Sequence, residues 1–315
     1  MISFPRTPTD AAAAQGELRA GGTDLNHRRH RGLNTADAVV DLRECAGMSL
    51  LGQREEGFVI GARVRIAAIA QDPDIARLYP GLAQAAGGLA TPQIRAIATL
   101  GGNLLQHVRC PYYRAPELIC LRKGGTTCLA RTGEHQNHVI FEQSASAAPS
   151  ASTLGVALLA HDALVRVEGR DAPLTVHELY NVAGKPSVHH TLADGELVTE
   201  AVLPAPYAGE RAAYFRTIHR LRAEWPIVEC VARLDVANGA IRAASIAVGA
   251  VANSPLRLTA VERFLTGQAA TLETLAAAAD QATQGATPMP RTAWKVDVLR
   301  STVQTTLELA LEVSP

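Results

Sequence analysis

The apolar positions of this chain follow two different periodicities. Short apolar runs bounded by glycine or polar residues predict buried strands, most clearly at 58–62 and 164–168. Apolar residues spaced three and four apart predict helices beginning at Ile66, around 82–89 and over 154–160. The first two thirds of the chain therefore mix strands and helices.

The last third has a different pattern. Three segments, 196–203, 213–220 and 227–236, are strand candidates, and Asn238-Gly239 is a strong signal for a two-residue hairpin. An antiparallel sheet is therefore expected here, with the prolines at 204 and 206 marking the boundary before this unit. Helical spacing then predicts three helices, near 256–265, 272–282 and 292–311.

Between these regions, residues 106–152 show no apolar periodicity. Cysteine, proline, tyrosine, glycine and serine dominate this stretch, and regular elements resume directly after it. Long structureless segments inside a compact domain are uncommon and usually functional. We interpret this stretch as an insertion into a domain that continues beyond it.

Composition narrows the possible functions. The 315 residues include 30 Lys and Arg and 30 Asp and Glu, so no global field collects nucleic acid. No apolar run approaches the ~18 residues of a membrane span, and the N-terminus has no apolar core of a secretory signal. Five scattered cysteines do not resemble a disulfide framework. We expect a soluble protein, with the cytoplasm as the default compartment.

Two glycine-rich turns are candidate ligand-binding segments. They contain Gly21-Gly22-Thr23 and Gly101-Gly102-Asn103, and glycine lets backbone N–H groups approach phosphate oxygens. Thr23, Thr99 and Asn103 can add side-chain donors, so the pair suits a ligand with a pyrophosphate. Neither turn matches a known nucleotide signature, and either one alone is more often an ordinary turn. Spacing alone leaves the question open.

Three of the cysteines crowd into the insertion. Cys110, Cys120 and Cys128 are separated by nine and seven residues, unlike the paired cysteines of zinc ribbons or the tight runs of bacterial ferredoxins. By spacing alone, a metal site and three buried thiols remain equally open. The basic run 28–31 and the pair His189-His190 are expected on exposed surface, and Trp225 is expected to pack on a sheet.

Several motifs together resemble one family. Residues 19–25 (RAGGTDL), 58–62 (FVIGA) and 93–103 (QIRAIATLGGN), with 249–255 (GAVANSP) in the tail, resemble the FAD-binding subunit of the xanthine dehydrogenase family of molybdenum hydroxylases. The resemblance implies an α+β fold: a two-part FAD-binding domain of the PCMH/vanillyl-alcohol-oxidase type, then an antiparallel sheet with a three-helix bundle. The implied domains are 1–56, 57–204 with the insertion, and 205–315.

The resemblance also implies a set of FAD-contacting residues. The two glycine turns would grip the pyrophosphate and ribityl region, while single residues before the second turn and in the tail would approach the flavin. Arg216 stands where relatives often have lysine. The implied set is Leu18, Arg19, Ala20, Gly21, Gly22, Thr23, Asp24, Leu25, Leu89, Thr99, Leu100, Gly101, Gly102, Asn103, Val198 and Arg216.

The insertion is similar to a segment of two branches of that family, 4-hydroxybenzoyl-CoA reductase and periplasmic aldehyde oxidoreductase. There it implies a 4Fe-4S cluster on four cysteines, of which Cys110, Cys120 and Cys128 match. The fourth position reads Ser144 or Ser146 here. Three outcomes stay open: a four-iron cluster completed by serine, His138 or water, a three-iron cluster, or a loop without iron.

The implied function is electron relay. A molybdenum cofactor on a large subunit would act on an aldehyde, an aromatic compound or an N-heterocycle, a small subunit with 2Fe-2S clusters would pass electrons, and the flavin on this chain would exchange them with an external acceptor. The alternatives are a stand-alone FAD oxidoreductase of the same fold and a cofactor-free scaffold subunit. No catalytic acid or base is expected on this chain. Export into the periplasm would require a partner's signal.

Overall fold

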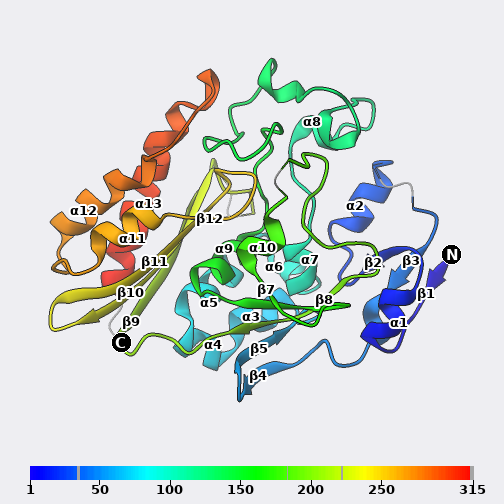
Figure 1. Ribbon diagram of the computed structural model, residues 1–315, viewed down its shortest axis with the longest axis horizontal. Helices are drawn as coiled ribbons and strands as arrows, with labels where there is room; N and C mark the ends of the chain where they lie inside the picture. The colour runs from blue at the N-terminus through cyan, green and yellow to red at the C-terminus, as the bar shows by residue number, and fades with distance from the viewer. Residues whose placement is uncertain (34–35, 183, 221–222, 313–315) are drawn as a thin grey trace.

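The fold is built on three β-sheets that follow one another along the chain (Figure 1). The computed structural model describes residues 1–33, 36–182, 184–220 and 223–312. Within these residues the strands are β1 (Ile2–Ser3), β2 (Glu17–Arg19), β3 (Val39–Asp41), β4 (Leu51–Arg54), β5 (Gly57–Gly61), β6 (Leu164–Glu168), β7 (Leu174–Thr175), β8 (Leu197–Leu203), β9 (Glu210–Thr217), β10 (Val228–Ala237), β11 (Ala240–Gly249) and β12 (Leu256–Arg257).

Helices connect and cover these sheets. They are α1 (Pro8–Ala13), α2 (Leu25–His30), α3 (Ile66–Gln71), α4 (Pro73–Leu78), α5 (Pro80–Gly88), α6 (Pro92–Arg95), α7 (Leu100–Leu104), α8 (Pro111–Arg114), α9 (Thr153–Ala160), α10 (Val176–Tyr180), α11 (Thr259–Leu265), α12 (Leu272–Asp280) and α13 (Trp294–Glu312). Several begin at proline or at a threonine that accepts a hydrogen bond from the first turn, as helix starts commonly do.

The first sheet is parallel, with strand order β1-β3-β2, and lies at the N-terminal end of the molecule. The second is antiparallel, with order β4-β5-β8-β6-β7. Every residue of β5 is buried, which explains its uninterrupted apolar sequence. Segment 196–203 forms the expected strand β8, which pairs with β5 and β6 of this sheet.

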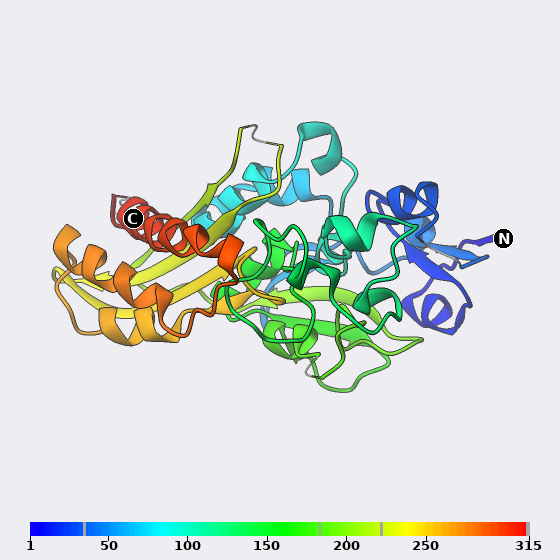
Figure 2. The ribbon, with the colours of Figure 1, turned by 90° about the horizontal axis from the view of Figure 1, so that it is seen from above.

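The C-terminal sheet has the order β12-β11-β10-β9, and α11, α12 and α13 pack together on one of its faces (Figure 2). Asn238 and Gly239 form the expected hairpin, with φ of 53° and 75°. The helix expected from residue 256 begins at Thr259, because Leu256–Arg257 instead pairs with β11 as a short edge strand. The expected α+β fold with three C-terminal helices is otherwise confirmed.

Helix α9 joins the second and third sheets. All eight of its residues are buried, and it contacts α5, β10 and β11. A helix that is apolar on every side must be enclosed on every side, which explains why its sequence shows no polar stripe. The face of the C-terminal sheet opposite α11–α13 therefore packs on the earlier part of the chain through α5 and α9.

The predicted insertion lies between α7 and α9. It contains the short helix α8 and single 3₁₀ turns, and Figure 1 shows it as an irregular cap above the two larger parts of the molecule. Backbone hydrogen bonds tie Ile140 and Phe141 to Val251 in the tail, and Asn253 Nδ2 donates to the carbonyls of Ser146 and Ala148. The insertion is therefore docked on the C-terminal part.

Candidate functional site

The first glycine turn connects β2 to α2 and leaves backbone donors free. Gly22 has φ of 71°, a conformation that glycine adopts without strain. Gly21 lies against the segment before the second turn, since a Cβ there would be 2.2 Å from the carbonyl oxygen of Ile97. Among the described residues, no acceptor faces the N–H groups of Gly21, Gly22 or Thr23. Three adjacent donors in a turn form a favourable setting for an anion.

The N–H groups of the second glycine turn are already hydrogen-bonded within the protein. The Thr99 hydroxyl accepts from the Gly102 N–H at 3.3 Å, and Gly101 donates to the carbonyl of Ala62 at 2.9 Å. Asn103 donates its N–H to the Thr99 carbonyl, while its side-chain Oδ1 accepts from Ser152 and from the N–H of Leu154. These groups are used internally, so this turn shapes a surface rather than offering backbone donors.

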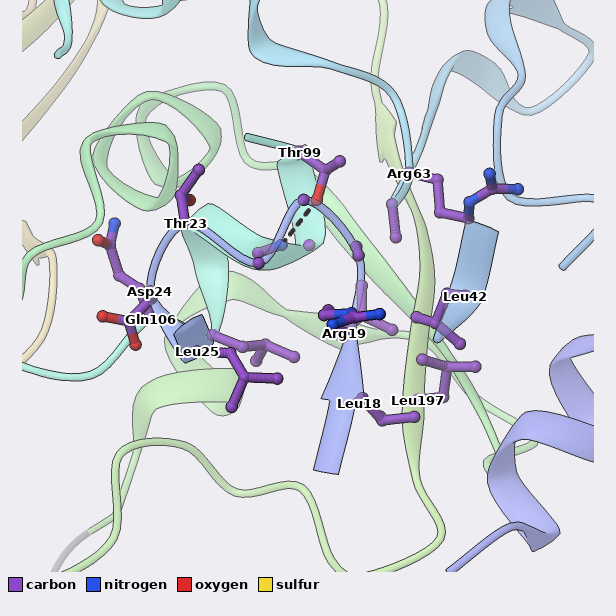
Figure 3. A pocket seen from close by; sticks show the side chains of 18 of the residues that line it. Leu18, Arg19, Thr23, Asp24, Leu25, Leu42, Arg63, Thr99, Gln106 and Leu197 are labelled. Carbon is purple, nitrogen blue, oxygen red and sulfur yellow. Dashed lines mark hydrogen bonds between the residues drawn. The ribbon is translucent and has the colours of Figure 1, made fainter. Parts of the chain in front are cut away.

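Both turns line one cavity, which opens to solvent (Figure 3). In this view Leu18, Leu42 and Leu197 lie on one side of it, whereas Thr23, Asp24 and Gln106 lie on another. Arg19 and Arg63 also line it, and they border a neighbouring basic hollow. Arg63 donates to the carbonyls of Arg43 and Cys45 rather than to a carboxylate.

A second hollow adjoins the first and shares Thr23, Asp24, Gly102 and Gln106 with it. Leu89 and Arg216 line this second hollow. Trp225 does so too, and it is 47% exposed, with the Arg109 guanidinium 4.5 Å from its ring centroid. The Trp225 ring therefore forms part of the hollow's wall.

Asp24 is the most strongly tied residue of the first turn. Its carboxylate is held by Arg28, Arg109 and Arg114 at distances of 3.1, 2.9 and 2.8 Å, and it accepts the N–H of His107. Burial raises its pKa, but Arg109 and Arg114 outweigh that effect and lower the pKa to about 2. Arg28 is itself buried, so the expectation that the whole run 28–31 is exposed is wrong at that residue.

The sequence-derived FAD set falls into three groups by position. The residues that line the first cavity are Leu18, Arg19, Ala20, Gly21, Gly22, Thr23, Asp24, Leu25, Thr99, Gly101, Gly102 and Val198. Those that line only the second hollow are Leu89, Asn103 and Arg216. Leu100 lines neither, because its side chain is fully buried in the main core.

Sequence reasoning missed some lining residues altogether. Leu42, Met48 and Leu197 give the first cavity an apolar wall, and His27 borders the second hollow. These are ordinary apolar or surface positions in the sequence, and only tertiary packing brings Leu42, Met48 and Leu197 together in one buried cluster. Ala62, which also lines the first cavity, lies at the end of the strand predicted at 58–62.

The three cysteines of the insertion lie around one small pocket. Cys110, Cys120 and Cys128 line it together with Arg122 and Ser146. Helix α8 supplies N–H groups of Tyr112 and Tyr113 to the Cys110 sulfur, and burial raises the pKa of this thiol. Ala147 donates its N–H to Cys128 Sγ at 3.3 Å. The thiols therefore have backbone donors of the kind that stabilise sulfur ligands.

Ser146 and His138 are non-thiol donors beside these cysteines. The Ser146 hydroxyl accepts from Arg122 Nε at 2.9 Å, and His138 Nε2 lies 3.3 Å from Cys110 Sγ. His138 is buried, and its Nδ1 has no partner among the described residues. Among all the residues that the structure describes, no three His, Cys, Asp or Glu side chains lie close enough together to form a metal site.

His189 and His190 do not form an exposed loop, contrary to expectation. The ring of His189 stacks on His107, with centroids 4.1 Å apart and planes 22° from parallel. Burial lowers the pKa of both His107 and His189, that of His107 to about 3, so both rings are neutral at pH 7. Tyr113 bonds His107 and touches His189, which links the cysteine pocket to the first turn.

Comparison with known proteins identifies the same two parts of the chain. Residues 9–206 match the family model for the FAD binding domain in molybdopterin dehydrogenase, and residues 213–307 match the CO dehydrogenase flavoprotein C-terminal domain. No helix in the described ranges is long and apolar enough to cross a membrane.

Two curated relatives illustrate the family. The aldehyde oxidoreductase FAD-binding subunit PaoB of Escherichia coli K12 is 31% identical over 292 residues, which cover 88% of this chain and 90% of PaoB. The 6-hydroxypseudooxynicotine dehydrogenase complex subunit alpha of Paenarthrobacter nicotinovorans is 25% identical, over 94% of this chain and 86% of its own length.

Solved structures have the same fold. The Cu,Mo-CO dehydrogenase structure matches with a TM-score of 0.77 and 20% identity, covering 98% of this chain and 96% of that chain. Quinoline 2-oxidoreductase from Pseudomonas putida 86 matches with a TM-score of 0.76 and 18% identity, covering 99% and 96%. With both family models and a relative at 31% identity in agreement, the chain belongs to the family of FAD-binding subunits of molybdenum hydroxylases.

Proposed function

We propose that this chain holds one FAD along the two adjoining cavities and relays electrons within a molybdenum hydroxylase complex. The observation that carries the proposal is that both glycine turns, far apart in sequence, line a single cavity that continues into a second hollow. An elongated dinucleotide needs such a path, with donors for its phosphates and apolar walls for its rings. The domain division at 56 and 204 remains part of this proposal.

The residues present fit this cofactor. The free N–H groups of Gly21, Gly22 and Thr23, with Arg19 and Arg63 nearby, suit a pyrophosphate. Leu42, Met48 and Leu197 suit an aromatic base. Leu89, Arg216 and Trp225 would then border the flavin ring in the second hollow.

The flavin would supply the redox chemistry, accepting and releasing electrons when bound. The chain's own residues would orient it. Asp24, fixed by its three arginines, holds the first turn against the insertion, while Thr99 and Asn103 hold the second turn in shape. Arg216 would place a positive charge beside the ring, where negative charge develops on reduction.

Family membership supports specific partners. We propose a molybdopterin-binding large subunit and a small subunit with 2Fe-2S clusters, with an aldehyde, an aromatic compound or an N-heterocycle as the substrate of the large subunit. The relatives' names describe subunits of an aldehyde oxidoreductase and of a dehydrogenase complex. The cytoplasm remains the predicted compartment.

Purification of the native complex tests this function. We expect the chain to copurify with two other subunits and to release one FAD per chain on acid treatment. A lone chain that oxidises a substrate unaided would contradict the subunit assignment. A folded complex without flavin would contradict the FAD assignment.

A second proposal concerns the cysteine pocket. We infer that Cys110, Cys120 and Cys128 hold an iron–sulfur cluster, with His138 or Ser146 beside the remaining iron. Three soft thiols converge on one pocket with N–H donors to two sulfurs and the Arg122 guanidinium beside them, a donor set that suits iron and sulfide once the thiols are deprotonated. Binding would require the thiols to draw closer together than they lie here.

Iron and sulfide analysis of single variants tests the cluster. We expect Cys110→Ser, Cys120→Ser and Cys128→Ser to lose most of the iron while retaining FAD. Cys45→Ala is the matched control, because Cys45 is buried in the main core away from this pocket and its loss should leave iron unchanged. Absence of iron and sulfide from the native complex would make the insertion a loop without a cluster.

A further inference from the structure

A buried carboxyl group lies behind the second hollow. Glu229 on β10 is 1% exposed, and its Oε2 accepts the hydroxyl proton of Tyr214 at 2.9 Å. It stands directly opposite Arg216 on β9 in the antiparallel register, so both side chains point to the same face of the sheet. That face packs on α5 and α9, where the C-terminal part meets the rest of the chain.

Thr153 connects this carboxyl to the hollow. Its hydroxyl lies beside Glu229 and Tyr214 and favours the ionised form of Glu229, while Thr153 itself lines the second hollow with Arg216. The carboxyl therefore has two neighbours that border the proposed flavin site, one a hydroxyl and the other a guanidinium. Glu229 lines neither cavity, and its effect on the ring would be indirect.

Space for this carboxyl is made by a glycine. A Cβ at Gly249 on β11 would lie 2.5 Å from Glu229 Oε1 and 2.6 Å from Val156 on α9. The Glu229 side chain therefore occupies a fixed volume between β11 and α9. An acidic group enclosed in this way is costly as an anion unless hydrogen bonds or a paired charge compensate it.

The surroundings of Glu229 allow both of its charge states. Burial raises its pKa, whereas Thr153, Tyr214 and Arg216 favour the anion. Two titratable groups on β9, Arg216 and Tyr214, affect the pKa of Glu229. Glu229 in turn affects the pKa of the adjacent Cys230 on β10. The contacting residues of α9 and β11, Val156 and Gly249, carry no titratable group.

We propose that Glu229 binds a proton when the flavin in the second hollow is reduced and releases it on reoxidation. This inference rests on the proposed FAD site. Two electrons would arrive from the iron–sulfur clusters of the complex, adding negative charge beside Arg216 and Thr153. One proton from solvent would then bond to the Glu229 carboxylate, with no other covalent bond formed or broken in this chain. The proton offsets one of the two negative charges that the electrons add to the buried region.

A redox titration of the flavin at several pH values tests this step. The native complex should take up one more proton per two electrons than the Glu229→Gln variant over the range where the glutamate changes state. Infrared difference spectra should show a carboxyl band appearing on reduction of the native protein and missing in Glu229→Gln. Equal proton uptake by the two proteins would overturn the proposal.

A pair of threonine variants guards against a folding defect in Glu229→Gln. Thr153→Ser keeps the hydroxyl and should retain the native proton uptake, whereas Thr153→Val removes it and should shift the pH range of the uptake. Identical behaviour of the serine and valine variants would contradict the role of Thr153. Native complex without FAD would defeat the proposed function, while bound FAD with unchanged proton uptake in Glu229→Gln would defeat only this inference.

Discussion

The two glycine turns look alike in sequence and differ in what their backbones do. The turn at Gly21 and Gly22 leaves adjacent N–H groups without an acceptor in the described chain, whereas the turn at Gly101 and Gly102 uses its N–H groups on Ala62 and Thr99. Both line the same cavity. A glycine-rich segment can therefore serve as a ligand's donor or as the wall against which the ligand is held.

The difference has a local cause. The first turn begins after β2 ends at Arg19, and Gly21 in this turn lies against Ile97. The backbone of the turn therefore faces the cavity instead of a neighbouring strand. The second turn begins the short helix α7. Its N–H groups are hydrogen-bonded to Thr99 and to the carbonyl of Ala62, directly after β5. The first turn should therefore govern affinity for FAD, and the second should govern stability.

Gly21→Ala should have the largest effect. The new Cβ would meet the Ile97 carbonyl oxygen at 2.2 Å, so the turn must move and its N–H groups lose their direction. We expect FAD affinity to fall by about 100-fold or more, measured by flavin fluorescence titration of the apoprotein. Gly87→Ala is the control, because its Cβ would meet only the Ala70 methyl at 3.8 Å. Native affinity in Gly21→Ala would break the comparison.

Asp24→Asn should have the next largest effect, on stability. The Asp24 pKa is lowered from 3.8 to about 2, so its ionised form stabilises the fold above pH ~4, by about 2 kcal/mol, and this contribution is lost as the pH falls through ~2. Urea unfolding at pH 7 should show a lower free energy of unfolding for Asp24→Asn than for the native protein. The variant should also lack the part of the fall in unfolding free energy that protonation of Asp24 causes at acid pH. Asp74→Asn, at an exposed pair with Arg77, should change little.

Thr99→Ala should have the smallest effect. It removes the side-chain cap of α7 and should cost about 1 kcal/mol of unfolding free energy. FAD affinity should fall only a few-fold, because the first turn is untouched. Thermal unfolding and FAD titration of the same preparation separate the two effects. A loss of affinity as large as that of Gly21→Ala would mean that the second turn also supplies donors.

Much of the fold could be predicted because local periodicity decides it. The buried strand β5, the helix α9 and the Asn238-Gly239 hairpin each have a short-range signal that their tertiary contacts reinforce. The strand Leu256–Arg257 was missed because its residues also suit a helical stripe, and only pairing with β11 decides between the two.

The site was less predictable than the fold. Motifs located the two turns and the cysteines, but no local signal shows that Asn103 bonds Ser152, that Arg28 is buried beside Asp24, or that His189 stacks on His107. These contacts join segments that are distant in sequence through an insertion without periodicity. Their geometry follows from tertiary packing, which single-sequence patterns do not contain.

Hydrogen exchange of the apoprotein and the FAD-loaded protein tests the central claim most directly. If FAD lies along both cavities, its addition should slow exchange at residues 20–25 strongly, with smaller changes at 99–103, where the amides are already bonded, and at 214–217, which pair with β10. Slowed exchange at 99–103 with none at 20–25 would contradict the account, as would FAD binding that leaves both segments unchanged.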